Sequence, residues 1–182
     1  MRLDLPDYAQ QAQTFVAIGV GAVLATIGGF VATLLEARLR RRERERTAAL
    51  TFGEILASLR VLLRAAQDAH GRGDPFGPLT LRLLRGARRE VEAYESNRPA
   101  LSDLRSADLR LSLHALMIRI TLGLDGVLDA KADVDREGSY AYLLSLAPAI
   151  DPLVRRLVPV AGQPITPYEE LAHTPQGRTP AA

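Results

Sequence analysis

The most restrictive feature of this sequence is a run of 22 residues, 14–35, that contains no charged side chain. Its polar side chains are the hydroxyls of Thr14, Thr26 and Thr33. A helix of this length reaches about 33 Å, at about 1.5 Å per residue, which is enough to cross a hydrocarbon core of about 30 Å. The run therefore predicts a transmembrane helix over residues 14–35, with the lipid bilayer as its surroundings.

A cluster of arginines follows this run at one end only. Residues 36–46 hold six Arg and three Glu, a surplus of three positive charges that should remain in the cytoplasm under the positive-inside rule. The architecture is common in bacteria, so we expect a single-pass protein of the inner membrane whose bulk is cytoplasmic. The cluster is a stop-transfer signal or, in addition, a contact for anionic lipids. The arginines are Arg38, Arg40, Arg41, Arg42, Arg44 and Arg46.

The segment before the run, residues 1–13, differs from a signal peptide. Its one positive charge, Arg2, is outnumbered by two negative charges, Asp4 and Asp7, so the basic region that opens a signal peptide is missing. The apolar run is also longer than the apolar region of a typical signal peptide. We therefore expect the anchor to remain uncleaved.

One face of the predicted anchor is lined with small side chains spaced four residues apart. Small residues at this spacing let two membrane helices approach closely and associate. Gly and Ala are also common in membrane helices that stay single. The pattern leaves open a homodimer or higher homo-oligomer, or a helix that is only rich in small residues. The face consists of Ala17, Gly21, Ala25, Gly29 and Thr33.

The remainder of the chain favours an all-α fold, because Leu, Ala and Arg dominate and β-branched residues are sparse outside the anchor. Apolar residues recur at helical spacing, and Gly- and Pro-rich turns near 70–78, 97–100 and 133–138 separate them. We expect the anchor to continue through a juxtamembrane helix, 36–46, into an antiparallel bundle of about four helices over 47–157. A Pro-rich disordered tail follows over 158–182. The first expected helix ends near residue 69. The other expected helices cover 79–96, 101–132 and 140–157, and Pro148 and Pro152 interrupt the last of them.

The third predicted helix is apolar on two sides, which is typical of a helix in the middle of a bundle or at a subunit contact. It is not expected to be a second membrane span, because each charge near the centre of a span costs about 2.5–3.5 kcal/mol. The residues that argue against a span are Arg110, His114, Arg119 and Asp125. One stripe holds Leu109, Leu113, Leu116, Ile120, Leu124 and Val127, and the other holds Leu111, Ala115, Ile118 and Leu122.

An acidic segment after this helix resembles the first half of a calcium loop. Asp133, Asp135 and Glu137 alternate and Gly138 follows, but Leu144 stands where the loop needs a bidentate Glu. We therefore expect no metal site here, but a polar helix terminus with a glycine stop.

No catalytic constellation is found in the sequence. The chain has no Cys, its three His are far apart, and its glycine pairs lie inside the predicted anchor rather than in a phosphate-binding loop. One set of residues on the third helix is interpreted as a possible buried polar network of structural character. These residues are Arg110, His114, Thr121 and Asp125.

These patterns favour a membrane-anchored interaction or scaffold module that self-associates through the anchor and binds a protein partner not identified by the sequence. The alternative is a membrane-tethered signalling or effector protein that transmits between bundle and membrane. It requires a continuous helix from Thr14 to Ala69. An enzyme is the least favoured class, and neither a cofactor nor nucleic acid is expected.

Overall fold

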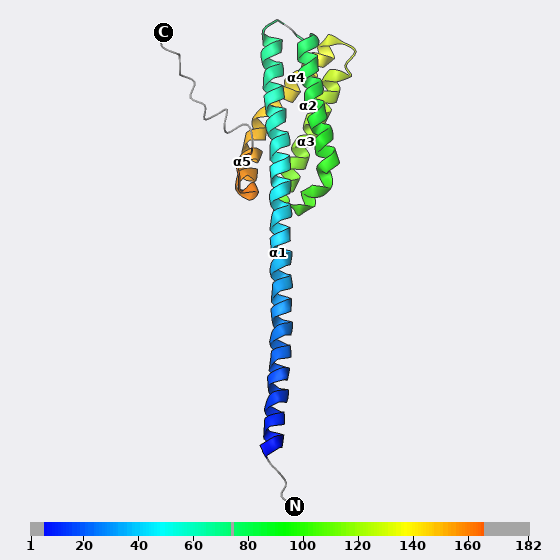
Figure 1. Cartoon of the computed structure of the whole chain (residues 1–182). Coiled ribbons are helices and arrows are strands. Elements are labelled where there is room, and N and C mark those ends of the chain that lie inside the picture. The colour runs from blue at the N-terminus through cyan, green and yellow to red at the C-terminus, as the bar shows by residue number, and fades with distance from the viewer. Residues whose placement is uncertain (1–5, 74, 166–182) are drawn as a thin grey trace, which may run out of the picture. The chain divides into compact units, whose positions relative to one another are not determined.

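The computed structural model describes residues 6–73 and 75–165, and of residues 6–18, 20, 22–25 and 27 it describes the backbone alone (Figure 1). All regular elements in these ranges are helical, and no strand occurs in them. The prediction of an all-α helical bundle is confirmed. The α-helices are α1 (Pro6–Gly71), α2 (Pro78–Asn97), α3 (Ala107–Leu128), α4 (Asp133–Leu146) and α5 (Ile150–Ala161), and the 3-10 helices are η1 (Arg98–Asp103) and η2 (Ala147–Ala149).

The chain divides into two units. The first extends to Glu43 and contains the N-terminal part of α1, and the second begins at Arg44 and contains the rest of α1 with all other helices. Within the second unit, α1 and α2 are joined by a short turn and run in opposite directions, and α3 reverses the direction again (Figure 1). The hydrophobic core belongs to this second unit.

The core forms because each helix buries one apolar stripe. The stripe of α1 and the first predicted stripe of α3 are both buried, as their spacing of three and four residues predicts. The largest fully buried side chains include Phe52, Leu56, Leu59 and Leu63 of α1, Leu84 and Tyr94 of α2, Leu113, Met117, Ile120 and Leu124 of α3, and Leu143 of α4.

The helix α3 packs closely against α4, and two glycines permit it. A Cβ atom on Gly126 would lie 2.9 Å from Cβ of Ser139, and one on Gly123 would lie 3.2 Å from Cβ of Leu143. These distances are too short for a larger side chain without movement of α4. The glycines therefore set how closely the two helices pack.

The ends of α3 differ from the expected 101–132. Residues 98–103 form η1, and α3 begins only after Ser106, whose Oγ accepts a hydrogen bond from the N–H of Leu109 at 3.2 Å. This side chain satisfies one of the N–H groups that have no partner within a helix. At the other end, α3 stops at Leu128, and residues 129–132 form the turn into α4.

The expected glycine stop at Gly138 is wrong, because Gly138 lies inside α4. Asp133 and Asp135 occupy the first turn of α4, where carboxylates interact favourably with the helix dipole. One internal glycine costs about 1 kcal/mol relative to alanine, which is less than the gain from burying side chains such as Tyr140 and Leu143. The turn is shorter and earlier than predicted, at residues 129–132.

The interruption around Pro148 is confirmed as two helices separated by η2. The N-cap of α5 is Ala149, and Asp151 lies in the first turn of this helix, where its carboxylate pairs with Arg60 of α1. The helix α5 includes Pro159 and ends where Gly162 adopts a left-handed conformation with φ of 68°. Ile165 is buried against Gly53 of α1, so packed chain extends past Leu157. Residues 166–182 of the expected tail lie outside the described residues.

One helix of the described residues, α3, is long and apolar enough to cross a membrane by length and composition, with a mean hydropathy of 1.5 in its 18-residue window. Core helices of water-soluble proteins meet the same criterion, and α3 supplies a buried stripe to this core. This helix is internal and differs from the run predicted to be the anchor. The N-terminal anchor over residues 14–35 stays a prediction.

Candidate functional site

The small-residue face of the predicted anchor lies in the first unit. Gly21, Gly29 and Thr33 are exposed, while the side chains of Ala17 and Ala25 lie outside the description. A Cβ on either glycine would meet no atom within 4 Å. The Thr33 hydroxyl donates to the carbonyl of Gly29 at 2.8 Å, which satisfies its donor within the helix. This helix surface therefore has space for another helix at Gly21 and Gly29.

The Arg-rich segment divides into two parts with different surroundings. Residues 36–44 are exposed, and Arg40 pairs with Glu36 at 2.5 Å, as expected for residues four apart. Glu45 lies within the second unit, where its carboxylate pairs with Nε of Arg105 at 2.9 Å. The guanidinium of Arg46 lies beside Gly162, with Nε 3.6 Å from where a Cβ would be. A cation there compensates the negative end of the dipole of α5.

The four residues of the predicted polar network make separate contacts, and no hydrogen bond joins any two of them in the part of the chain that is described. Arg110 donates to the carbonyls of Leu104 and Arg105. Thr121 donates to the carbonyl of Met117 at 2.8 Å. Asp125 pairs with Arg88 of α2, and His114 bonds Tyr94 of α2. Each of the four residues therefore bonds a group outside the predicted network.

The contact between Tyr94 and His114 connects α2 to α3. Tyr94 is 1% exposed, and its Oη lies 2.8 Å from Nδ1 of His114. The pKa of Tyr94 is raised to about 12, mainly by burial and to a smaller extent by the Glu95 carboxylate, while Arg98 acts in the opposite direction. The phenol is therefore neutral at physiological pH and inaccessible. The pair is a structural bond rather than an acid–base site.

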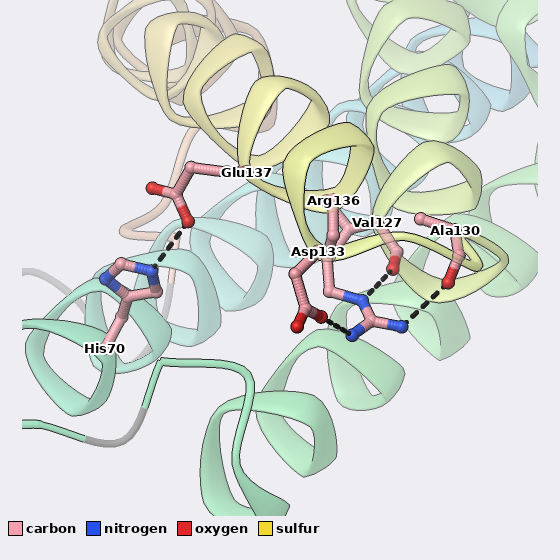
Figure 2. A network of polar contacts seen from close by, with 6 residues as sticks. All are labelled: His70, Val127, Ala130, Asp133, Arg136 and Glu137. Atoms are coloured by element: carbon pink, nitrogen blue, oxygen red, sulfur yellow. Dashed lines mark hydrogen bonds and ion pairs between the residues drawn. The ribbon is translucent and has the colours of Figure 1, made fainter.

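Sequence reasoning missed a second cluster, which joins the turn after α1 to α4. The ring of His70 stacks on Tyr140 with centroids 4.6 Å apart, and Phe76 packs its edge against both rings at 5.1 and 5.5 Å. Figure 2 shows His70 and Glu137 facing each other across the two elements, with Nε2 and Oε2 3.4 Å apart. The cluster closes this end of the bundle.

Arg136 holds the adjacent turn between α3 and α4. Its guanidinium donates to the carbonyls of Val127 at 3.3 Å and Ala130 at 2.7 Å, and it pairs with Asp133 at 2.8 Å (Figure 2). Its Cζ also lies 5.6 Å from the ring centroid of Phe76, within the range of a cation–π interaction. One arginine thus satisfies carbonyls at the end of α3 and covers the aromatic cluster.

The hydroxyl of Tyr140 is buried and, in the described part of the chain, has no hydrogen-bond partner. Burial, and to a smaller extent the nearby carboxylates of Glu137 and Asp68, together raise the pKa of Tyr140 to about 12. A neutral, enclosed phenol cannot serve as a base near pH 7. The role of this cluster is structural, because it attaches the turn after α1 to α4.

The acidic residues of the calcium-like segment do not converge. They lie on a helix, where Asp133 pairs with Arg136 and Glu137 contacts His70. Among residues 6–73 and 75–165, no group of three or more potential metal ligands occurs. Helical geometry sends side chains two residues apart to different sides, whereas a calcium loop folds alternate residues around one point.

No spacing rule could have found the aromatic cluster, because His70, Phe76 and Tyr140 come from segments up to 70 residues apart. The one available signal was Phe76, a large apolar residue in a Gly- and Pro-rich turn. Comparison with known proteins finds no matching family model, no matching curated protein and no matching solved structure.

Proposed function

We propose that this chain is a membrane-anchored helical interaction module that self-associates through its N-terminal helix. The observation that carries the proposal is the uncharged run 14–35, which ends at an arginine cluster and leads into a helical bundle. The anchor crosses the bacterial inner membrane once, with the bundle in the cytoplasm. The bundle offers its surface to a protein partner.

Two features support self-association through the anchor. The small residues recur every four positions over 17–33, and a side chain added to Gly21 or Gly29 would meet open space. Close helix contact in a bilayer depends on such positions, since lipid provides no hydrophobic drive for helix pairing.

A second candidate function is signalling between membrane and bundle. It requires a helix without interruption from Thr14 to Ala69, and α1 has helical backbone from Pro6 to Gly71. The pairing of Arg60 with Asp151, on α1 and α5, links that helix to the end of the bundle. Inserting two glycines after Arg42 tests this candidate, because signalling through α1 would be lost while anchoring would be retained.

Membrane anchoring is tested by washing membranes that contain the protein with alkaline carbonate. The full chain should stay in the pellet, and a variant without residues 1–35 should be released. A variant without residues 166–182 is the control and should stay. Release of the full chain would contradict the anchor.

Self-association is tested by measuring anchor dimerisation in membranes. Gly21→Ile combined with Gly29→Ile should reduce the dimer by about tenfold, because bulky side chains separate the two backbones. Gly19→Ile is a single-site control, since about 100° of rotation per residue places Gly19 about 160° around the helix from Gly21 and about 80° from Gly29. An equal effect of both substitutions, or none from either, would refute this face as the contact.

A further inference from the structure

The helix α3 carries an apolar face that no part of the described chain covers. Leu111 is 70% exposed, Ile118 is 44% exposed and Leu122 is 62% exposed, and Ala115 between them is exposed as well. This second stripe lies apart from the stripe that α3 buries in the core. Large apolar side chains gathered along one helix face are typical of an interaction surface.

The spacing of this stripe indicates a helical partner. Its members follow one another after four, three and four residues, the alternation that forms the seam of a coiled coil. In a parallel pair, each seam residue packs into a hole formed by the same part of the partner helix, so such a stripe is complementary to itself. The small Ala115 in the middle lets the two backbones approach closely.

The charges around the stripe are compatible with a second copy. Asp108 at one end is paired with Arg156 at 2.5 Å, and Asp125 at the other end is paired with Arg88. Both carboxylates are therefore compensated within the chain before any partner arrives. Arg119 at the edge is exposed and can extend its charge into solvent on its long stem.

The size of the stripe limits how it can act. Residues 111–122 span about 16 Å, whereas a self-sufficient coiled coil needs about three to four heptads. A stable interface between free proteins buries about 800 Å² on each partner. Four side chains fall short of this area, so the stripe joins only copies that are already held close together.

We propose that the stripe Leu111, Ala115, Ile118 and Leu122 packs in parallel against the same stripe of a second copy in the same membrane. This rests on the proposed function, because associated anchors would hold the two bundles at an effective concentration of about millimolar. Within the second unit, α3 runs parallel to the α1 segment, so two copies whose α1 segments in this unit run side by side in the same direction present α3 in the same direction (Figure 1).

Disulfide cross-linking of the full chain in membranes tests the proposal, because the natural chain has no Cys. Leu111→Cys should form dimers at least about tenfold faster than Leu79→Cys, a matched control at an exposed leucine of α2. Adding Ile118→Asp to Leu111→Cys should reduce cross-linking to the control rate. Adding Val61→Asp, at a residue with similar exposure on α1, should leave the rate unchanged. All variants are first checked for an unchanged unfolding midpoint.

A separate reporter, Gln13→Cys beside the anchor, distinguishes failure of this proposal from failure of anchor self-association. Cross-linking of Gln13→Cys without cross-linking of Leu111→Cys would overturn the α3 contact and leave the anchor contact intact. Cross-linking of Leu111→Cys alone would support the α3 contact but overturn the anchor contact and, with it, the inference that the stripe needs associated anchors. Cross-linking of neither would overturn both contacts.

Discussion

Two buried tyrosines show that the effect of a hydroxyl on stability depends on whether it has a hydrogen-bond partner. Tyr94 has a hydrogen bond to His114, whereas the hydroxyl of Tyr140 has no partner among the described residues. A buried polar group without a partner has lost its contact with water and gained nothing in return. The same substitution should therefore have opposite effects at the two positions.

Tyr94→Phe should lower the free energy of unfolding by about 1 kcal/mol, because it removes a hydrogen bond between α2 and α3. Tyr140→Phe should leave stability unchanged or raise it by up to about 1 kcal/mol, because it removes an unsatisfied hydroxyl. Urea unfolding followed by circular dichroism measures both changes. Equal losses in the two variants would show that Tyr140 has a partner after all.

Stability should also fall at high pH. The pKa of both Tyr94 and Tyr140 is raised to about 12, whereas tyrosine in an unfolded chain ionises near pH 10. Between these values the unfolded chain has released protons that the folded chain retains, so rising pH favours unfolding. The stabilisation is complete below pH 10 and is lost as pH approaches 12.

The measurement is the urea midpoint at pH 9, 10, 11 and 12. The other groups that titrate in this window are Lys131, which is the only Lys, and the three tyrosines Tyr8, Tyr142 and Tyr168, so the wild-type curve needs a matched variant for comparison. The variant with both Tyr94→Phe and Tyr140→Phe should show a smaller fall. An identical fall in that variant would exclude the two phenols as its cause.

At the scale of elements, the room for a side chain at a glycine depends on the residue that packs opposite it. Gly126 of α3 faces Ser139, whose Cβ would be only 2.9 Å from an added Cβ. Gly86 of α2 faces Leu62, and an added Cβ would lie 3.4 Å from its nearest atom, an ordinary contact. Helix propensity favours alanine at both positions, so packing decides the difference.

Gly86→Ala should stabilise the protein by up to about 1 kcal/mol through helix propensity. Gly126→Ala should destabilise it by about 1 kcal/mol net, because the cost of overpacking exceeds the gain in propensity. Thermal and urea unfolding of the two variants provide the comparison. Stabilisation by Gly126→Ala would mean that α4 can move away from α3 at little cost.

The helix boundaries that sequence reasoning predicted well are those with local causes. The end of α2 near Asn97 follows from the proline two residues later, and the break around Pro148 follows from that proline. The start of α3 and the continuation of α4 through Gly138 were predicted wrongly. The start of α3 has a local cause that was overlooked, the Ser106 side chain that caps the helix. At Gly138, burial of side chains such as Tyr140 and Leu143 outweighed the weak local preference of glycine.

At the scale of the whole molecule, the end of the described chain returns to its first helix. Ile165 is 2% exposed and lies against Gly53, where the absence of a side chain leaves room for it. The predicted end of the bundle at residue 157 therefore omits part of the core.

Ile165→Ala should reduce the free energy of unfolding by about 3 kcal/mol, the usual cost of truncating a buried isoleucine. Val134→Ala is the matched control: Val134 is 83% exposed, so its truncation should change stability by less than about 0.5 kcal/mol. Urea unfolding of the full chain in detergent measures both. A small effect of Ile165→Ala would indicate that this segment leaves the core readily.

By itself, the sequence determined the helical class, the apolar stripes and the uncharged N-terminal run, because these depend on composition and on spacing within one segment. It also identified both stripes of α3. Only the tertiary structure decided that one stripe is buried and the other exposed, and that His70, Phe76 and Tyr140 meet. Periodicity reports that a helix face is apolar but not what covers it. Contacts between distant segments depend on how whole helices pack.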